Sequence, residues 1–184
     1  MSKRIALLSA AAFGALALTA TLVAPVSAQE KTVMVGGAAM FPSKNIIQNA
    51  VHSKDHTTLV AAVKAAGLVE TLEGKGPFTV FAPTNTAFGK LPAGTVDTLV
   101  KPENKPTLTK ILTYHVVPGR LEASSLTDGK KLKTVEGEEL TVKKSGGTVT
   151  IVDAKGGSST VTIPNVNQSN GVIHVVDTVL MPAS

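Results

Sequence analysis

Apolar residues in the first half of the chain recur at helical spacing. The clearest case lies between residues 53 and 68, where one predicted helical face carries Leu59, Val60, Val63 and Leu68. Asp55 is a candidate N-cap for this helix, and Gly67 can end it. A second helix is expected over residues 44–51, with Ser43 as its N-cap.

A strand is predicted at residues 78–82, before Pro83 and a short helix capped by Thr84. Helical turns are expected over residues 93–100 and 105–112, interrupted by Pro102 and Pro106. Before all of these, residues 30–40 are expected to form a short strand that ends in two glycines.

Beyond Gly119 the pattern changes to alternating, strand-like segments. They cover residues 131–137, 138–145, 147–156 and 159–166, and turns are expected at Gly137, Gly146 and Gly156. The last segment, 170–182, is apolar on both alternating faces, which predicts a strand buried on both sides. Helices followed by an antiparallel meander indicate an α+β domain.

The first 28 residues have the features of a secretory signal peptide. Lys3 and Arg4 precede a long apolar run that contains Pro25, and small residues lead to a cleavage site after Ala28. The alternative is a membrane anchor, because about 20 apolar residues can span a bilayer. We expect cleavage, which gives a secreted or periplasmic bacterial protein that does not span the membrane. The processed chain is expected to have a lead strand or arm at residues 29–42 and one domain at residues 43–184.

Composition narrows the classes of function. Without Lys3 and Arg4, 16 basic residues face 13 acidic ones, and a scattered net charge of +3 does not favour nucleic-acid binding. The chain has no cysteine, which excludes thiol catalysis and thiolate metal sites. No phosphate-binding glycine motif occurs in its helical or strand context, so no cofactor is expected.

Two segments, Phe78–Phe88 and Asn170–Pro182, resemble a fasciclin domain, with "TYHVVPG" at Thr113–Gly119 between them. The resemblance covers nearly all of the chain after residue 28, and the leading segment Thr32–Ile46 also resembles secreted bacterial single-domain members. It implies a wedge-shaped β-sandwich flanked by short helices, no enzyme activity, and adhesion to a cell-surface or matrix protein or polysaccharide. The positions that carry the resemblance as structural motifs are Phe78, Phe81, Pro83, Thr84, Asn85, Asn170, Gly171 and His174.

The same resemblance implies two candidate interaction motifs. One is Tyr114–His115, and the other is Pro164-Asn165-Val166, where integrin-binding members of the family have an Asp-Ile pair. Asn165 lacks the negative charge of that acid, so an integrin-type contact is doubtful here. The hypothesis is therefore binding through exposed loops near residues 113–123 and 164–170.

Tyr114 and His115 are open to two interpretations. They could contact a ligand, or one ring could fill the core while His115 forms an internal hydrogen bond, with Thr84 or Asn85 as the expected partner. Neighbouring residues of an extended chain face opposite ways, and buried polar groups need partners, so the structural interpretation is preferred.

Other polar residues have weaker alternatives. His174 and Asp177 could be a catalytic base and the acid that orients it. However, side chains three residues apart on a strand point to opposite faces, and no nucleophile motif accompanies the pair. His52 and His56 could bind a metal on a continuous helix, but a solvated loop capped by Asp55 is favoured. Lysines 130, 131, 133, 143 and 144 are expected on a solvated strand face that could meet an acidic polysaccharide or an anionic lipid. The main alternative function is a periplasmic carrier of a small apolar ligand.

Overall fold

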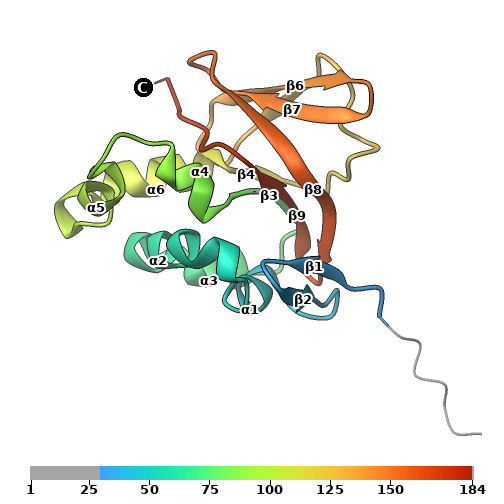
Figure 1. Cartoon of the computed structure of the whole chain (residues 1–184), viewed down its shortest axis with the longest axis horizontal. Helices are drawn as coiled ribbons and strands as arrows, with labels where there is room; N and C mark the ends of the chain where they lie inside the picture. The colour runs from blue at the N-terminus through green and yellow to red at the C-terminus, as the bar shows by residue number, and fades with distance from the viewer. Residues whose placement is uncertain (1–29, 184) are drawn as a thin grey trace, which may run out of the picture.

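The structure is a computed structural model that describes residues 30–183. Its helices are α1 (Ile46–Ala50), α2 (Thr57–Ala66), α3 (Val69–Glu73), α4 (Asn85–Gly89), α5 (Thr95–Leu99) and α6 (Lys105–Tyr114), with 3₁₀ turns η1 (Lys54–His56) and η2 (Pro102–Asn104). Its strands are β1 (Val33–Val35), β2 (Ala38–Met40), β3 (Phe78–Pro83), β4 (Val116–Pro118), β5 (Lys131–Lys133), β6 (Glu139–Ser145), β7 (Thr148–Val152), β8 (Ser158–Gln168) and β9 (Gly171–Val176). The helices gather beside β3, β4 and β9, whereas β6 and β7 lie on the other side of the molecule (Figure 1).

Seven strands form one mixed sheet in the order β4-β3-β9-β8-β7-β6-β5. Every neighbouring pair is antiparallel except β3 and β9, which are parallel. The backbone N–H of Val135, just after β5, donates to the carbonyl of Val116 in β4 at 2.8 Å. The two ends of the sheet therefore meet, and the expected sandwich is a single sheet curled into a nearly closed barrel within an α+β domain.

Two apolar clusters lie on either side of the central strands. The first lies between the helices and the sheet and includes Val63, Leu112 and Ile173. The second fills the inside of the curled sheet and includes Phe81 and Leu140. All six residues of β9 are buried, which confirms the strand predicted to be buried on both faces.

Some of the helix caps predicted from the sequence are present in the structure and others are not. Thr84 Oγ1 accepts from Ala87 N at 3.2 Å and Gly67 ends α2 with a φ of 73°, as predicted. Ser43 is not the N-cap of α1, because Asn45 fills that position and forms a reciprocal capping box with Gln48.

Two more expectations at helix ends were wrong. Asp55 does not cap α2, because it lies inside η1 and the first residues of α2 continue directly from that turn. Pro106 does not interrupt α6, since it lies in the first turn, where a missing N–H costs nothing.

The two glycines of the expected lead strand form the turn of a β-hairpin. Gly36 and Gly37 have φ angles of 57° and 76°, a pair of left-handed conformations that matches the twist of a two-residue hairpin loop. Val35 and Met40 from the hairpin are buried in the first cluster. The hairpin is therefore packed against the domain.

Candidate functional site

Tyr114 and His115 lie at the C-terminal end of α6, and the chain is not extended there. Their side chains still enter different parts of the core. Tyr114 is completely buried in the cluster inside the sheet, and His115, 2% exposed, borders the helix side. The two rings therefore cannot act together on one bound molecule.

The hydroxyl of Tyr114 connects three segments of the barrel. It accepts a hydrogen bond from Ala154 N at 2.9 Å and donates to the carbonyl of Glu139 at 3.3 Å. Burial raises the pKa of Tyr114, an effect that the Ala154 N–H opposes. The phenol thus ties α6 to β6 and to the turn between β7 and β8, which is a structural role.

Both ring nitrogens of His115 are satisfied inside the protein. Nδ1–H donates to the carbonyl of Ile111 at 2.8 Å, and Nε2 accepts from Leu180 N at 3.0 Å. These partners fix one neutral tautomer, and complete burial lowers the pKa of His115 to about 4. The burial expected of a structural histidine is found, but the expected partners Thr84 and Asn85 were wrong.

Thr84 and Asn85 instead organise the start of α4. Asn85 Oδ1 accepts from Thr58 N at 3.0 Å, and its amide donates to the carbonyl of Lys54 at 2.9 Å. The "FAPTN" turn therefore holds η1 and α2 in place. Of the other motif positions in this strand, Phe81 and Pro83 are buried and Phe78 is half-buried.

His174 is a completely buried histidine in the middle of β9. Its Nε2–H donates to the carbonyl of Leu121 at 2.7 Å, and Nδ1 accepts from Asn165 N at 3.3 Å. The ring stacks on Phe81 with 5.7 Å between centroids. Burial lowers the pKa of His174, which keeps the ring neutral near pH 7.

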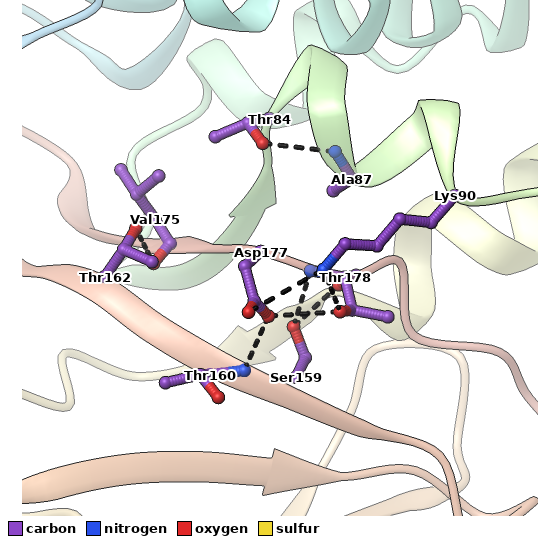
Figure 2. Close-up of polar contacts among 9 residues, drawn as sticks. All are labelled: Thr84, Ala87, Lys90, Ser159, Thr160, Thr162, Val175, Asp177 and Thr178. Carbon is purple, nitrogen blue, oxygen red and sulfur yellow. Dashed lines mark hydrogen bonds and ion pairs between the residues drawn. The ribbon is translucent and has the colours of Figure 1, made fainter.

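Asp177 does not pair with His174. Its Oδ1 accepts from Thr160 N at 2.9 Å and from the hydroxyl of Thr178 at 3.0 Å, and Oδ2 lies 3.7 Å from Lys90 Nζ. Figure 2 shows this cluster between β8 and α4. The base and orienting acid of a hydrolase are therefore not assembled at these two residues.

The two loops expected to bind a partner lie side by side. Arg120 Nη1 donates to Asn167 Oδ1 at 2.9 Å, and Nη2 donates to the carbonyl of Gln168 at 2.7 Å. Asn165 Oδ1 accepts from Ala123 N at 2.7 Å. We call the surface formed by residues 118–125 and 164–169 the loop surface.

The motif Pro164-Asn165-Val166 lies at an irregular point of β8. The register of β8 against β9 shifts on both sides of Ile163, and Asn165 has a φ of 56°, rare outside glycine but tolerated by asparagine. Pro164 is exposed, Asn165 half-buried and Val166 buried. Only part of the expected motif is thus available to a partner.

Asn170 and Gly171 are structural. Asn170 Oδ1 accepts from Ile46 N at 3.1 Å, and its amide donates to the carbonyls of Leu72 and Gly74, so one side chain joins α1 to the end of α3. A Cβ at Gly171 would lie 2.0 Å from the carbonyl oxygen of Phe78. The parallel contact between β3 and β9 therefore requires glycine at this position.

The segment from His52 to His56 differs from the expected solvated loop. His52 is exposed, but His56 is only 3% exposed and its Nδ1 lies 2.8 Å from Ser53 Oγ. The two histidines do not face a common site. Within residues 30–183, no group of three or more His, Asp or Glu side chains is arranged to hold a metal ion.

The meander lysines are largely in solvent. Lys131, Lys133, Lys143 and Lys144 are exposed, and Lys131 forms an ion pair with Glu139 at 3.4 Å. Lys130 is half-buried and donates to the carbonyl of Ser125.

None of the helices in the described part of the chain has the length and apolar character needed to cross a membrane.

Fold and site together define an α+β domain in which the buried rings of His115 and His174 are hydrogen-bonded internally, with a polar loop surface. Comparison with known proteins agrees: the fasciclin domain family model matches residues 54–182. The chain is 48% identical over 168 residues to Protein sll1483 of Synechocystis sp., covering 91% of this chain and 90% of that protein. The chain therefore belongs to the fasciclin domain family.

Similarity at lower identity extends to a mycobacterial protein and to a solved structure. Immunogenic protein MPB70 of Mycobacterium bovis is 38% identical over 138 residues, which cover 72% of this chain and 66% of that protein. A solved FAS1 domain pair from the insect cell adhesion molecule fasciclin I aligns with a TM-score of 0.68 at 19% identity. The alignment covers 77% of this chain and 52% of the solved chain. Because the identity is only 19%, this likeness concerns the fold alone.

Arg120 is the residue of the loop surface that sequence reasoning missed. A signal was available, because Arg120 is the only arginine after Arg4 in a chain that otherwise uses lysine. A guanidinium presents several donors in a fixed plane, so it suits bridging an amide oxygen and a backbone carbonyl.

Proposed function

We propose that the protein is an exported, non-enzymatic binding module that contacts a cell-surface or matrix component through the loop surface. The observation that carries the proposal is the bridge from Arg120 to Asn167 and Gln168, which joins two loops far apart in sequence into one surface. Family membership supports the class of function, since one relative is named as a cell surface glycolipoprotein and the solved neighbour as a cell adhesion molecule.

The chemistry of the loop surface favours a polar partner, since the charges of Arg120 and half-buried Glu122 balance within it. Pro118, Arg120, Ser124, Ser125, Pro164 and Ser169 are exposed on it. Prolines and serines offer a surface that costs little conformational entropy to order, and Arg120 adds one positive charge and free donor capacity. A polysaccharide or protein with hydroxyl groups fits these features.

An integrin-type contact is not part of the proposal. Metal-dependent recognition requires a carboxylate, whereas Asn165 is neutral. In addition, Asn165 Oδ1 already accepts a hydrogen bond from Ala123 N.

The test is a pull-down from cell-envelope fractions of the producing organism, with the purified protein immobilised. Arg120→Ala and Ser124→Arg should each reduce capture of the specific component at least about fivefold, because the first removes a charge-assisted donor and the second places bulk on the surface. Lys143→Ala is the matched control, because Lys143 is an exposed cation on β6, outside residues 118–125 and 164–169.

The melting temperatures of Ser124→Arg and Lys143→Ala should stay close to that of the wild type, which separates binding from stability. Arg120→Ala should melt somewhat lower, because it also removes the bridge to Asn167 and Gln168. Capture that both loop variants leave unchanged would move the binding surface elsewhere. Export has a separate test: the protein recovered from the periplasm or medium should begin at Gln29, and recovery of the full-length chain in the membrane would contradict cleavage.

A further inference from the structure

An apolar cavity lies between the helices and the sheet, apart from the polar groups of the loop surface. It has a volume of about 50 Å³. Side chains from β2, α1, α2, α3 and β9 line it, among them Met40, Ile47, Leu59, Val63, Leu72 and Ile173. No lysine, arginine, aspartate or glutamate is among the lining residues.

Two histidines reach this cavity, and they differ in one respect. His115 has a partner on each ring nitrogen, as described above. His56 uses only Nδ1, toward Ser53 Oγ, and Nε2 makes no hydrogen bond although it is fully buried. A buried polar atom without a partner is uncommon and costly, so its presence in an apolar cavity points to a missing partner.

The charge state of His56 limits what that partner can be. Burial lowers the pKa of His56, which the nearby Ala82 backbone and the charge of Asp55 only partly oppose, so the ring is neutral near pH 7. The Ala82 backbone does not give Nε2 a well-directed hydrogen bond. With a neutral ring and apolar walls, an ionic group would lose its hydration without compensation.

The lining also indicates where a molecule can enter. Most of the lining residues are buried, but Ala50 at the end of α1, Val60 on α2 and Leu68 between α2 and α3 are half-buried. These three lie where the cavity approaches the surface. A molecule can therefore enter between α1 and α2 with its polar end toward His56.

We propose that this cavity binds a small neutral alcohol with an apolar body, whose hydroxyl forms a hydrogen bond with His56 Nε2. A hydroxyl both donates and accepts, so it satisfies Nε2 in either tautomer that the Ser53 contact allows. One water needs roughly 10–15 Å³ of such space, so about 50 Å³ accommodates about three to five non-hydrogen atoms. The proposal does not depend on the loop surface.

Isobutanol and isopentane are matched probes, since they differ only by a hydroxyl in place of a methyl group. Each is titrated into the purified protein and followed by NMR through the methyl groups of Leu59, Val63 and Ile173 and the ring nitrogens of His56. Isobutanol should shift these methyl signals and His56 Nε2 in a saturable way. It should bind about five- to tenfold more tightly than isopentane once each affinity is corrected for the transfer of the probe from water.

Three variants locate the site. His56→Phe keeps a ring but removes both nitrogens, and should abolish the preference for isobutanol. Ala50→Leu should obstruct entry and weaken both probes, whereas Ala61→Leu, at an exposed position on α2 that does not line the cavity, should change neither.

The outcomes that overturn the proposal are distinct. No shift at the cavity methyl groups with either probe refutes binding there. Equal affinity for both probes in the wild type refutes recognition by His56, and this comparison needs no variant, so it holds even if His56→Phe fails to fold. Water contacts to His56 that isobutanol does not displace would show that the partner of Nε2 is an ordered water only.

Discussion

Acidification should destabilise this protein through His115. The ring is completely buried, donates to the carbonyl of Ile111 and accepts from Leu180 N, so both nitrogens are used in the neutral form. Protonation removes the acceptor at Nε2 and puts a charge in the core. The folded state therefore resists protonation, and the pKa falls from its ordinary value of 6.5 to about 4.

The sign and size of the effect follow from this difference. Between pH 6.5 and 4 the unfolded chain binds a proton that the folded chain does not, so stability falls as the pH falls. The contribution is complete above the unfolded value and is lost progressively down to about pH 4. A difference of about 2.5 pH units at about 1.4 kcal/mol each corresponds to about 3 kcal/mol.

The assay is urea unfolding followed by far-UV circular dichroism at several pH values between 7.5 and 4.5. Wild type is compared with His115→Gln, which is neutral throughout this range and retains a donor and an acceptor. At pH 7.5 the variant should be less stable by about 1–3 kcal/mol, because glutamine fits the two backbone partners less well. At pH 4.5 the gap should be about 2–3 kcal/mol smaller, or reversed.

The comparison cancels the other titrating groups, since His56, His174 and the carboxylates are present in both proteins. His52→Gln, at an exposed position, controls for the loss of a histidine as such and should follow the wild-type profile. If the curves of wild type and His115→Gln run parallel across this range, the assignment of a buried, neutral His115 is wrong.

Five further substitutions test the remaining structural assignments by the same unfolding assay. Tyr114→Phe should lower stability by about 1–2 kcal/mol because it leaves Ala154 N without an acceptor, and native Tyr114 should be shielded from acrylamide quenching. Gly171→Ala should cost more than about 3 kcal/mol or prevent folding, because its Cβ would overlap the carbonyl of Phe78, whereas Gly89→Ala, with open space around it, should be neutral or stabilising by up to about 1 kcal/mol. Asn165→Ala should be less stable than Asn165→Gly by about 1 kcal/mol because both lose the bond from Ala123 N but only alanine is strained at a φ of 56°.

The sequence allowed the burial of strands to be predicted but not their pairing. Apolar residues on both faces of residues 171–176 correctly indicated a strand covered on both sides, and the alternating segments after residue 130 correctly indicated a meander. The parallel contact of β3 with β9 joins residues more than 90 positions apart. A periodic pattern reports what covers a strand and carries no information about which strand lies beside it.

The hydrogen-bond partners of the buried rings could not be predicted either, because several of them come from segments far away in the sequence. Burial of Tyr114 and His115 followed from general rules about polar groups in cores, yet their partners come from the turn after β7 and from Leu180 near the C-terminus. His56 shows a different failure. The expected break between two helices at residues 53–55 suggested a solvated loop, but η1 turns His56 inward while His52 stays in solvent.

The loop surface and the core are mechanically linked through His174. Nε2–H holds the carbonyl of Leu121 in one loop, and Nδ1 accepts from Asn165 N in the other, so one buried ring fixes both. Because Nδ1 must be unprotonated to accept, any condition or substitution that changes His174 disturbs the loops and the core together. A loss of binding in a His174 variant would therefore not distinguish recognition from folding. Exposed residues such as Ser124, which the ring does not hold, are the positions at which binding can be altered alone.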